Sequence, residues 1–430
     1  MTVAEKAADV EFASSKEVPV TTVDEEPEFP EGGLQAWLAV AGSFLVYFAS
    51  FGVINSFGTF QNFYETEYLS NYTSTVIAFI GALQITILYV EGLFIGSLFD
   101  SFGLKWLYLI GCAGSVLSTI ALSFTRPQAI WQQFLSQGVL FGLAVGFGFQ
   151  PALCVVGHYF RRRRALAMGI VAAGSSVGGV CLPIMFSRLF DRIGFAWTVR
   201  VAALITLVCY TIAILITRER LPHKPLKRVR DLIDFDGFRD RRYALFAAGS
   251  FLVNLGLYSP YFYLEPFAKA YGVSDHVHPY LLSIVNGTSF FGRILGGQAA
   301  DRYGRMNVLV PSTALSGILC LAFWLPSRGA VPLVLFACFY GFFSGIFISV
   351  APAAVGQMSP TDRLGARIGT FFLPVALATL LGTPIGGAFV KNQTSAEYNH
   401  VAIFAGTTIT GGAAMIAVAR GWCAGWREKW

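Results

Sequence analysis

Long apolar segments separated by short polar ones make up the chain from residue 34 onward. A helix needs about 20 apolar residues to cross the hydrocarbon core of a bilayer, and about twelve segments approach that length. The pattern therefore predicts an all-α membrane protein with twelve transmembrane helices in two groups of six. The predicted helices are Leu34–Phe60, Val76–Leu98, Trp106–Phe124, Phe134–Val156, Ala165–Leu189, Trp197–Thr217, Ala244–Phe267, Tyr280–Ala300, Val308–Leu325, Val331–Val350, Ile368–Val390 and Val401–Ala419.

A polar stretch after the sixth helix divides the chain into two halves. The tail before the first helix holds nine acidic and two basic residues, and it lacks the apolar region of a signal peptide. We expect an acidic, disordered cytosolic tail, two helical bundles, a basic linker and a short second tail. The corresponding ranges are 1–33, 34–217, 218–243, 244–420 and 421–430.

Composition agrees with a membrane protein and argues against an enzyme. Hydrophobic residues make up 55% of the chain and charged residues 13%, with a mean hydropathy of +0.59, whereas soluble domains contain about 25% charged residues. The seven cysteines form no CxxC pair, so we expect neither a disulfide framework nor a zinc site. No Gly-rich nucleotide loop precedes a predicted strand, no HExxH motif occurs, and no GxSxG nucleophile elbow between a strand and a helix is predicted. No enzyme activity, metal or cofactor is expected.

The basic residues predict the orientation in the membrane. With both termini cytosolic, the inner segments hold 21 Lys and Arg and the outer segments hold 7, as the positive-inside rule requires. We expect a multi-pass protein of the cell membrane, with the vacuolar membrane as an alternative. Sequons at Asn71 and Asn392 fall in outer loops and predict N-glycosylation. The run Arg161–Arg164 lies in a short inner loop, so we interpret it as an orientation and lipid-contact signal and not as a nucleic-acid site.

The two halves repeat a charged motif. The second helix ends in the segment Gly96–Lys105 and the eighth in Gly297–Arg305, and both read G-x-x-x-D-x-x-G followed by a cation. Duplicated six-helix halves with a substrate site between them are typical of a large class of transporters. Each motif can form a cytosolic charge latch, although a pair of ordinary charged turns would look the same. The predicted gate residues are Asp100, Lys105, Asp301, Arg302 and Arg305.

These residues resemble the major facilitator superfamily, and within it the fungal branch of the monocarboxylate porter family. One mark is the acid-Gly-Gly entry Pro30–Gly33, followed by Trp37. A more specific mark is Tyr159–Gly169, which reads YFRRRRALAMG and leads into the fifth helix. Further matches are Asn286, Phe291–Ile294, Tyr340–Gly345 and Gly382–Gly387. The resemblance implies a major facilitator fold with two pseudo-symmetric bundles and transport by alternating access.

The resemblance also implies a role for an arginine in the eighth helix, with two departures. Arg293 matches the arginine that binds carboxylate in well-known animal members. Asn55 stands at the position of their helix-one lysine, and Ser289 at that of the aspartate four residues before the arginine. This chain therefore keeps the anion-binding arginine and lacks the two residues that handle the proton in those members. The resemblance alone does not imply proton symport of the lactate type.

Two charges fall inside predicted helices, where charge is costly unless it serves a function. Arg293 predicts binding of a substrate anion, because a guanidinium can hold a carboxylate through two parallel hydrogen bonds; the alternative is a structural ion pair. Glu91 predicts proton coupling, since a buried carboxyl can load and release a proton in each cycle. A salt bridge or a polar helix contact is the alternative for Glu91.

Uncharged residues complete the candidate substrate site. Pro260 should break the seventh helix and place Tyr258 and Tyr261 at the depth of a cavity, where they can stack on an organic ligand; an interfacial aromatic belt is the alternative. Asn55 and Asn286 are polar groups that lipid would reject, and they either contact substrate or join helices by hydrogen bonds.

Together these features predict a secondary active transporter of a small organic acid of the monocarboxylate type. Proton coupling, import or export and the exact substrate stay open. The alternatives are an efflux pump for a fungal secondary metabolite, a carrier of a riboflavin-like aromatic compound, and a membrane sensor that binds without transport. The expected partners are an organic anion, a proton and the lipid bilayer, and we expect a monomer that binds no nucleic acid.

Overall fold

The computed structural model describes residues 29–220, 235–274, 276–359, 364–390, 394–423 and residue 428. All regular secondary structure in these residues is helical. The first half contains α1 (Leu34–Asn55), α2 (Phe57–Phe63), η1 (Tyr64–Tyr68), α3 (Ser74–Phe102), α4 (Leu104–Leu122), α5 (Ile130–Gln133), η2 (Phe134–Leu140), α6 (Phe141–Gly157) and α7 (Arg164–Ile216). The second half contains η4 (Phe235–Arg239), α8 (Arg241–Leu257), α9 (Ser259–Ala270), η5 (His278–Tyr280), α10 (Leu281–Tyr303), α11 (Arg305–Leu319), η6 (Cys320–Trp324), α12 (Ala330–Gln357), α13 (Leu364–Phe389) and α14 (Ser395–Cys423).

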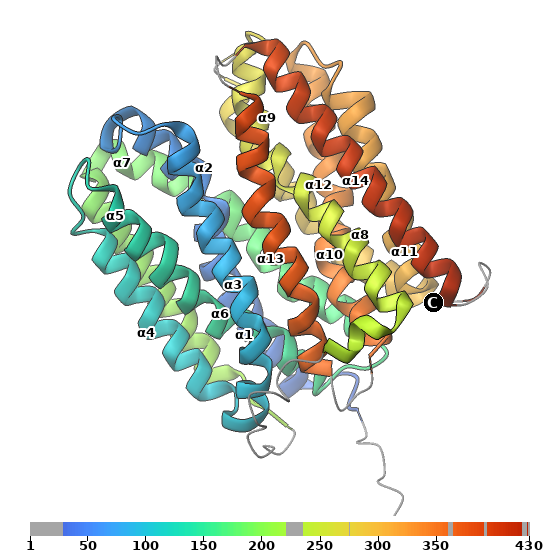
Figure 1. The fold of residues 1–430 in the computed structure, drawn as a ribbon. Coiled ribbons are helices and arrows are strands. Elements are labelled where there is room, and N and C mark those ends of the chain that lie inside the picture. Colours follow the sequence, from blue (N-terminus) through green and yellow to red (C-terminus); the bar gives the residue numbers. More distant parts are fainter. Residues whose placement is uncertain are drawn as a thin grey trace, which may run out of the picture.

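The helices form two bundles that lie side by side (Figure 1), with α1–α7 in one and α8–α14 in the other. Within the described residues, nine helices are by length and composition long and apolar enough to cross a membrane. The twelve predicted spans are all present. One of the nine helices, α7, contains two spans; α8 and α9 together make another span, and α10, the least apolar, makes the last. The fold prediction is therefore confirmed.

Local sequence explains two breaks in the helices. Gly194 in α7 has a φ of 75° and a ψ of 170°, a backbone conformation that residues with a Cβ rarely adopt. This glycine separates the fifth span from the sixth. The seventh span breaks at Tyr258, between α8 and α9, and Pro260 stands in the first turn of α9 as predicted. The hydroxyl of Tyr340 donates a 2.7 Å hydrogen bond to the carbonyl oxygen of Leu257 at this break.

Large apolar side chains on the outer surface of the bundles are exposed, among them Leu215 (72%), Phe124 (69%) and Trp106 (64%). In water such a surface would be unstable, but in a bilayer lipid covers it. Small residues allow the bundles to touch. A Cβ added to Gly369 of α13 would come within 2.6 Å of the carbonyl oxygen of Gly92 in α3, so only glycine allows this approach.

Candidate functional site

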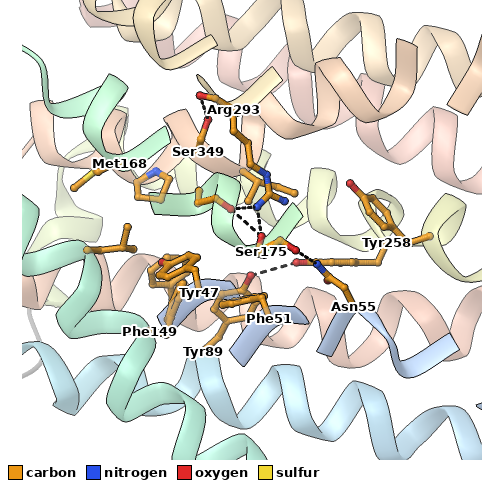
Figure 2. Close-up of a pocket in the computed structure, with 16 residues that line it drawn as sticks. Tyr47, Phe51, Asn55, Tyr89, Phe149, Met168, Ser175, Tyr258, Arg293 and Ser349 are labelled. Atoms are coloured by element: carbon orange, nitrogen blue, oxygen red, sulfur yellow. Dashed lines mark hydrogen bonds between the residues drawn. The ribbon is translucent and has the colours of Figure 1, made fainter. Parts of the chain in front are cut away.

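A cavity lies between the two halves, with about 590 Å³ of empty space including the part open to solvent. Its side chains come from α1, α3, α6 and α7 on one side and from the break between α8 and α9, α9, α10, α12 and α13 on the other. Figure 2 shows these side chains. Most of the wall is aromatic or aliphatic, and a few polar groups are placed within it. The lining residues are Tyr47, Phe51, Asn55, Tyr89, Phe149, Leu153, Met168, Ala172, Ser175, Tyr258, Tyr261, Arg293, Ile348, Ser349, Pro352 and Phe372.

Arg293 is the only charged residue in this lining. Its side chain is 4% exposed, and no carboxylate forms a salt bridge with it in the described part of the chain. Nε donates to Oγ of Ser289 (3.1 Å), and Nη1 donates to the carbonyl oxygen of Ala172 (2.6 Å) and to Oγ of Ser175. Nη2 makes no hydrogen bond to any described residue, and this nitrogen is not fully buried. A positive charge with two unused N–H donors therefore faces the cavity.

Aromatic side chains from both halves surround this charge. The hydroxyls of Tyr89 in α3 and Tyr258 lie 3.3 Å apart and link the halves. The rings of Tyr89 and Phe372 stack with their centroids 5.1 Å apart, and Tyr261 packs 6.0 Å from Tyr258. The Tyr261 hydroxyl is buried without a hydrogen-bond partner. This wall suits a ligand with flat apolar surfaces, and it offers phenolic groups as adaptable donors or acceptors.

The two predicted asparagines take different places. Asn55 lines the cavity, and its Nδ2 donates to the carbonyl oxygen of Ser175 (3.2 Å). Asn286 does not line it: the side chain is fully buried against Gly179 of α7, Nδ2 donates to the carbonyl oxygen of Leu282 (3.1 Å), and Oδ1 has no partner. Its position matches a contact between helices, which was the alternative reading.

Glu91 faces the interior of the first bundle. Its Oε1 packs against Gly146 of α6, where any added side chain would overlap the carboxyl group. The residue is 9% exposed, and Oε1 has no hydrogen-bond partner. No described basic residue forms a salt bridge with it. Glu91 is thus separate from the cavity, although Tyr89 on the same helix lines the cavity.

The predicted gate residues are only partly brought together. The carboxylate of Asp301 accepts the backbone N–H groups of Ala165 (3.2 Å) and Leu166 (2.8 Å) at the first turn of α7, which lies in the other half. A carboxylate is favourable at a helix N-terminus because the helix dipole is positive there. Arg305 lies 3.7 Å from Asp301. Of the remaining three predicted residues, Lys105 and Arg302 are exposed, and Asp100 is half-buried near the end of α3.

A second carboxylate holds the loop before α7. Glu31 accepts the backbone N–H groups of Arg161 (2.8 Å), Arg162 (2.5 Å) and Arg163 (3.1 Å), and its own N–H donates to the carbonyl oxygen of Tyr159 (3.0 Å). The acid-Gly-Gly entry and the arginine run, two separate family marks in the sequence, are therefore one structural unit.

Replacing Glu31 with glutamine should destabilise the protein by about 1–2 kcal/mol, as the loss of a good helix cap does. Partial burial alone would raise the pKa of Glu31, but the three backbone donors and the Arg162 charge lower the pKa overall. Because the folded pKa is lowered, this contribution is present above the unfolded pKa and is lost as pH falls through the folded pKa. Thermal unfolding in detergent at several pH values measures it.

The control for this prediction is Glu67→Gln, which removes an equal charge from an exposed residue of η1. The cap assignment is wrong if both variants unfold at the same temperature at neutral pH.

Most of the aromatic wall was not predicted from the sequence, although a signal for part of it was present. Tyr47, Phe51 and Asn55 are spaced four residues apart, so they share one face of α1. Met168 and Ser175 are likewise seven residues apart on one face of α7. The polar member of each set marks the face that turns away from lipid.

The remaining predicted features lie outside this site. Asn71 is exposed in the loop before α3, and Asn392 falls outside the described residues. No cluster of three or more potential metal ligands occurs among the residues that the structure describes.

Comparison with known proteins places the chain in a family. It matches the Major Facilitator Superfamily over residues 36–327 and 267–423. It is 36% identical to "MFS transporter asaE" of Aspergillus flavus over 398 residues (92% of this chain, 89% of that protein) and 37% identical to "MFS-type transporter 1" of Ophiocordyceps sp. over 406 residues (94% and 90%). The "Aspyridones efflux protein apdF" of Emericella nidulans is 36% identical over 384 residues (88% and 77%).

A solved structure shares the fold. The human organic anion transporter MFSD10 (TETRAN) superposes with a TM-score of 0.67 at 15% identity, covering 90% of this chain and 97% of that one. These matches confirm the superfamily, whereas the narrower monocarboxylate porter assignment stays a prediction. From its sequence and its fold, the chain belongs to the Major Facilitator Superfamily of membrane transporters.

Proposed function

We propose that the protein exports a small organic anion with an aromatic or otherwise flat apolar body, of the secondary-metabolite kind, by alternating access. The observation that carries this proposal is the buried guanidinium of Arg293, which has no acidic partner in the described chain and stands in an aromatic cavity between the halves. Burying an unpaired charge costs several kcal/mol, and a ligand anion would compensate for that cost.

Relatives support export over uptake. Two relatives that are each 36% identical to this chain are named "Aspyridones efflux protein apdF" and "Fujikurins efflux protein". The lining of the cavity is mostly aromatic or aliphatic, which suits a substrate with an apolar body better than a carboxylate as small as lactate. Uptake of a simple monocarboxylate therefore has less support, and we propose export of a metabolite.

Within this proposal Arg293 binds the acidic group, Asn55 supplies a polar contact, and Tyr258 and Tyr261 pack on the flat body of the substrate. Asn286 is proposed as a helix contact and not as a substrate ligand. Asp301 and Arg305 act with the start of α7 as the cytosolic gate. The sequon at Asn71 is exposed and remains a proposed glycosylation site on the outer face of the cell membrane.

Glu91 is proposed as the proton-coupling group. An ionised carboxylate packed against Gly146 would be a buried charge with no counter-ion in the described residues, whereas the protonated form is a neutral group of nearly the same shape. Proton binding is thereby linked to the packing of α3 on α6. Because α3 also carries Tyr89 at the cavity, a change in that packing can reach the substrate site.

Anion selectivity can be tested with two aromatic compounds that differ in charge. Purified protein in liposomes should move labelled 2-naphthalenesulfonate, which stays ionised and does not leak through lipid, with saturable kinetics. The neutral 2-naphthalenesulfonamide should compete at least about tenfold more weakly, because it forgoes charge-assisted hydrogen bonds of about 1.5–3 kcal/mol.

Protein-free liposomes are the control for leakage. Equal competition by the two compounds would overturn the anion proposal and favour a neutral metabolite. Saturable binding without any flux would instead favour the sensor alternative.

A further inference from the structure

Arg293 connects the two halves as well as facing the cavity. It belongs to α10 in the second half, and both bonds of Nη1 go to α7 in the first. We call the two groups that accept them, the carbonyl oxygen of Ala172 and Oγ of Ser175, the α7 acceptor pair. Nε, by contrast, bonds to Ser289 one turn earlier in α10 itself (3.1 Å). The guanidinium therefore makes two hydrogen bonds that join the halves and one that does not.

The lining of the cavity shows which side of the guanidinium a ligand reaches. Ala172 and Ser175 line the cavity, whereas Ser289 is fully buried and does not. Figure 2 shows the guanidinium pointing at Ser175 within the ring of cavity side chains. A ligand in the cavity therefore meets the Nη1–Nη2 end and not the Nε side.

An oxyanion bound at this end needs both nitrogens. Bidentate binding uses two parallel N–H groups, one from each nitrogen. Nη2 has its donors unused, but Nη1 gives both of its hydrogens to the α7 acceptor pair. The ligand can complete its second bond only if Nη1 gives up a bond to α7. The substrate and the α7 acceptor pair thus compete for the same donor.

The contact that this competition loosens is one that must open during transport. On the side of Arg293 where α7 begins, α7 and α10 touch through glycines: Gly169 packs on the carbonyl oxygen of Arg293, and Gly297 packs on that of Ala165. Asp301 adds its two hydrogen bonds to the same end of α7. In the orientation predicted from the basic residues, this end faces the cytosol, so α7 and α10 must separate there before the cavity can open inward.

We propose that the α7 acceptor pair occupies Nη1 in the empty carrier and so slows the opening of the cytosolic side, and that a substrate oxyanion speeds this opening by taking the place of the pair. This inference rests on the proposed function and adds to it a positioning residue, Ser175. It means that the loaded carrier changes orientation faster than the empty one. Exchange of substrate for substrate should then exceed net efflux.

The test compares these two rates in liposomes with labelled 2-naphthalenesulfonate inside. Exchange is measured with unlabelled compound outside, and net efflux is measured without it. In the unmodified protein exchange should be several times faster. Ser175→Ala removes one charge-assisted acceptor, so net efflux should rise about fivefold relative to exchange, and the ratio should fall toward one.

Three variants make the result specific. Ser289→Ala removes an acceptor that stays within α10, and Ser176→Ala removes a buried hydroxyl that has no hydrogen-bond partner; both should keep the ratio of the unmodified protein. Ser175→Cys keeps a side chain of similar shape and offers a weaker acceptor, so it should lower the ratio even if the alanine variant is unstable.

The outcomes separate the inference from the proposed function. Saturable flux with the same ratio in Ser175→Ala, Ser175→Cys and the unmodified protein would overturn the role of the α7 acceptor pair and leave anion transport standing. An equal fall in Ser289→Ala would also overturn it, because the effect would then not depend on a bond between the halves. Absence of saturable flux in the unmodified protein would overturn the proposed function itself.

Discussion

Replacing Arg293 with alanine should reduce transport of 2-naphthalenesulfonate roughly a hundredfold or more. Two charge-assisted hydrogen bonds to an oxyanion are worth about 1.5–3 kcal/mol each, and both are lost together. The cavity keeps its aromatic wall in this variant, so binding of the neutral 2-naphthalenesulfonamide should change little. Concentration dependence of flux in liposomes, together with binding of both compounds, measures the difference.

Arg293→Lys separates charge from geometry. Lysine keeps the positive charge but cannot present two parallel N–H groups, so we expect transport between that of the alanine variant and that of the unmodified protein. Arg200→Met is the matched control, because Arg200 stacks between Phe124 and Trp197 away from the cavity (4.7–5.1 Å to the ring centroids). If Arg293→Ala transports the sulfonate normally, Arg293 has a structural role only.

Replacing Glu91 with glutamine should abolish the response of transport to a pH gradient while exchange at equal pH continues. Glutamine has almost the shape of a protonated glutamate, so the packing of α3 against Gly146 is kept. It cannot release a proton, however, and the carrier is then fixed in one of the two forms that a coupled cycle requires. Flux driven by an imposed pH gradient, compared with exchange in the same liposomes, measures the effect.

The matched control is Glu265→Gln. Glu265 lies in α9, in a membrane-spanning segment of the other half, and its carboxylate is 3.7 Å from Nδ1 of His278. This variant should keep the response to the pH gradient. A response retained in Glu91→Gln and lost in Glu265→Gln would move the coupling group to the second half, and a response retained in both would exclude Glu91.

The spans could be predicted because each depends on nearby residues. Hydrocarbon accepts a run of apolar residues wherever it stands in the chain, so the order of twelve spans followed from composition along the sequence. The break in the seventh span followed from Pro260, because proline interrupts a helix whatever surrounds it. The least apolar span, α10, is not among the nine helices that are long and apolar enough to cross by themselves, and it was identified from its length between charged and turn residues.

The cavity was predicted only where a residue is unusual for lipid. Arg293, Asn55, Tyr258 and Tyr261 were singled out by charge, polarity or a broken helix, and all four line the cavity. Asn286 met the same criterion and instead packs against Gly179, because a buried amide also suits a contact between helices. Polarity alone cannot separate these two uses.

By itself the sequence determined that the chain spans a membrane as twelve helices, that its two halves repeat a motif, and that one arginine stands where lipid would reject it. The tertiary structure decided which groups meet: that Glu91 faces Gly146 and not the cavity, and that the Arg293 guanidinium bonds to Ser175, 118 residues away. Hydropathy is a property of each segment, and it is readable locally. A hydrogen bond between helices depends on how both rotate and cross, and that is fixed only when the two halves pack together.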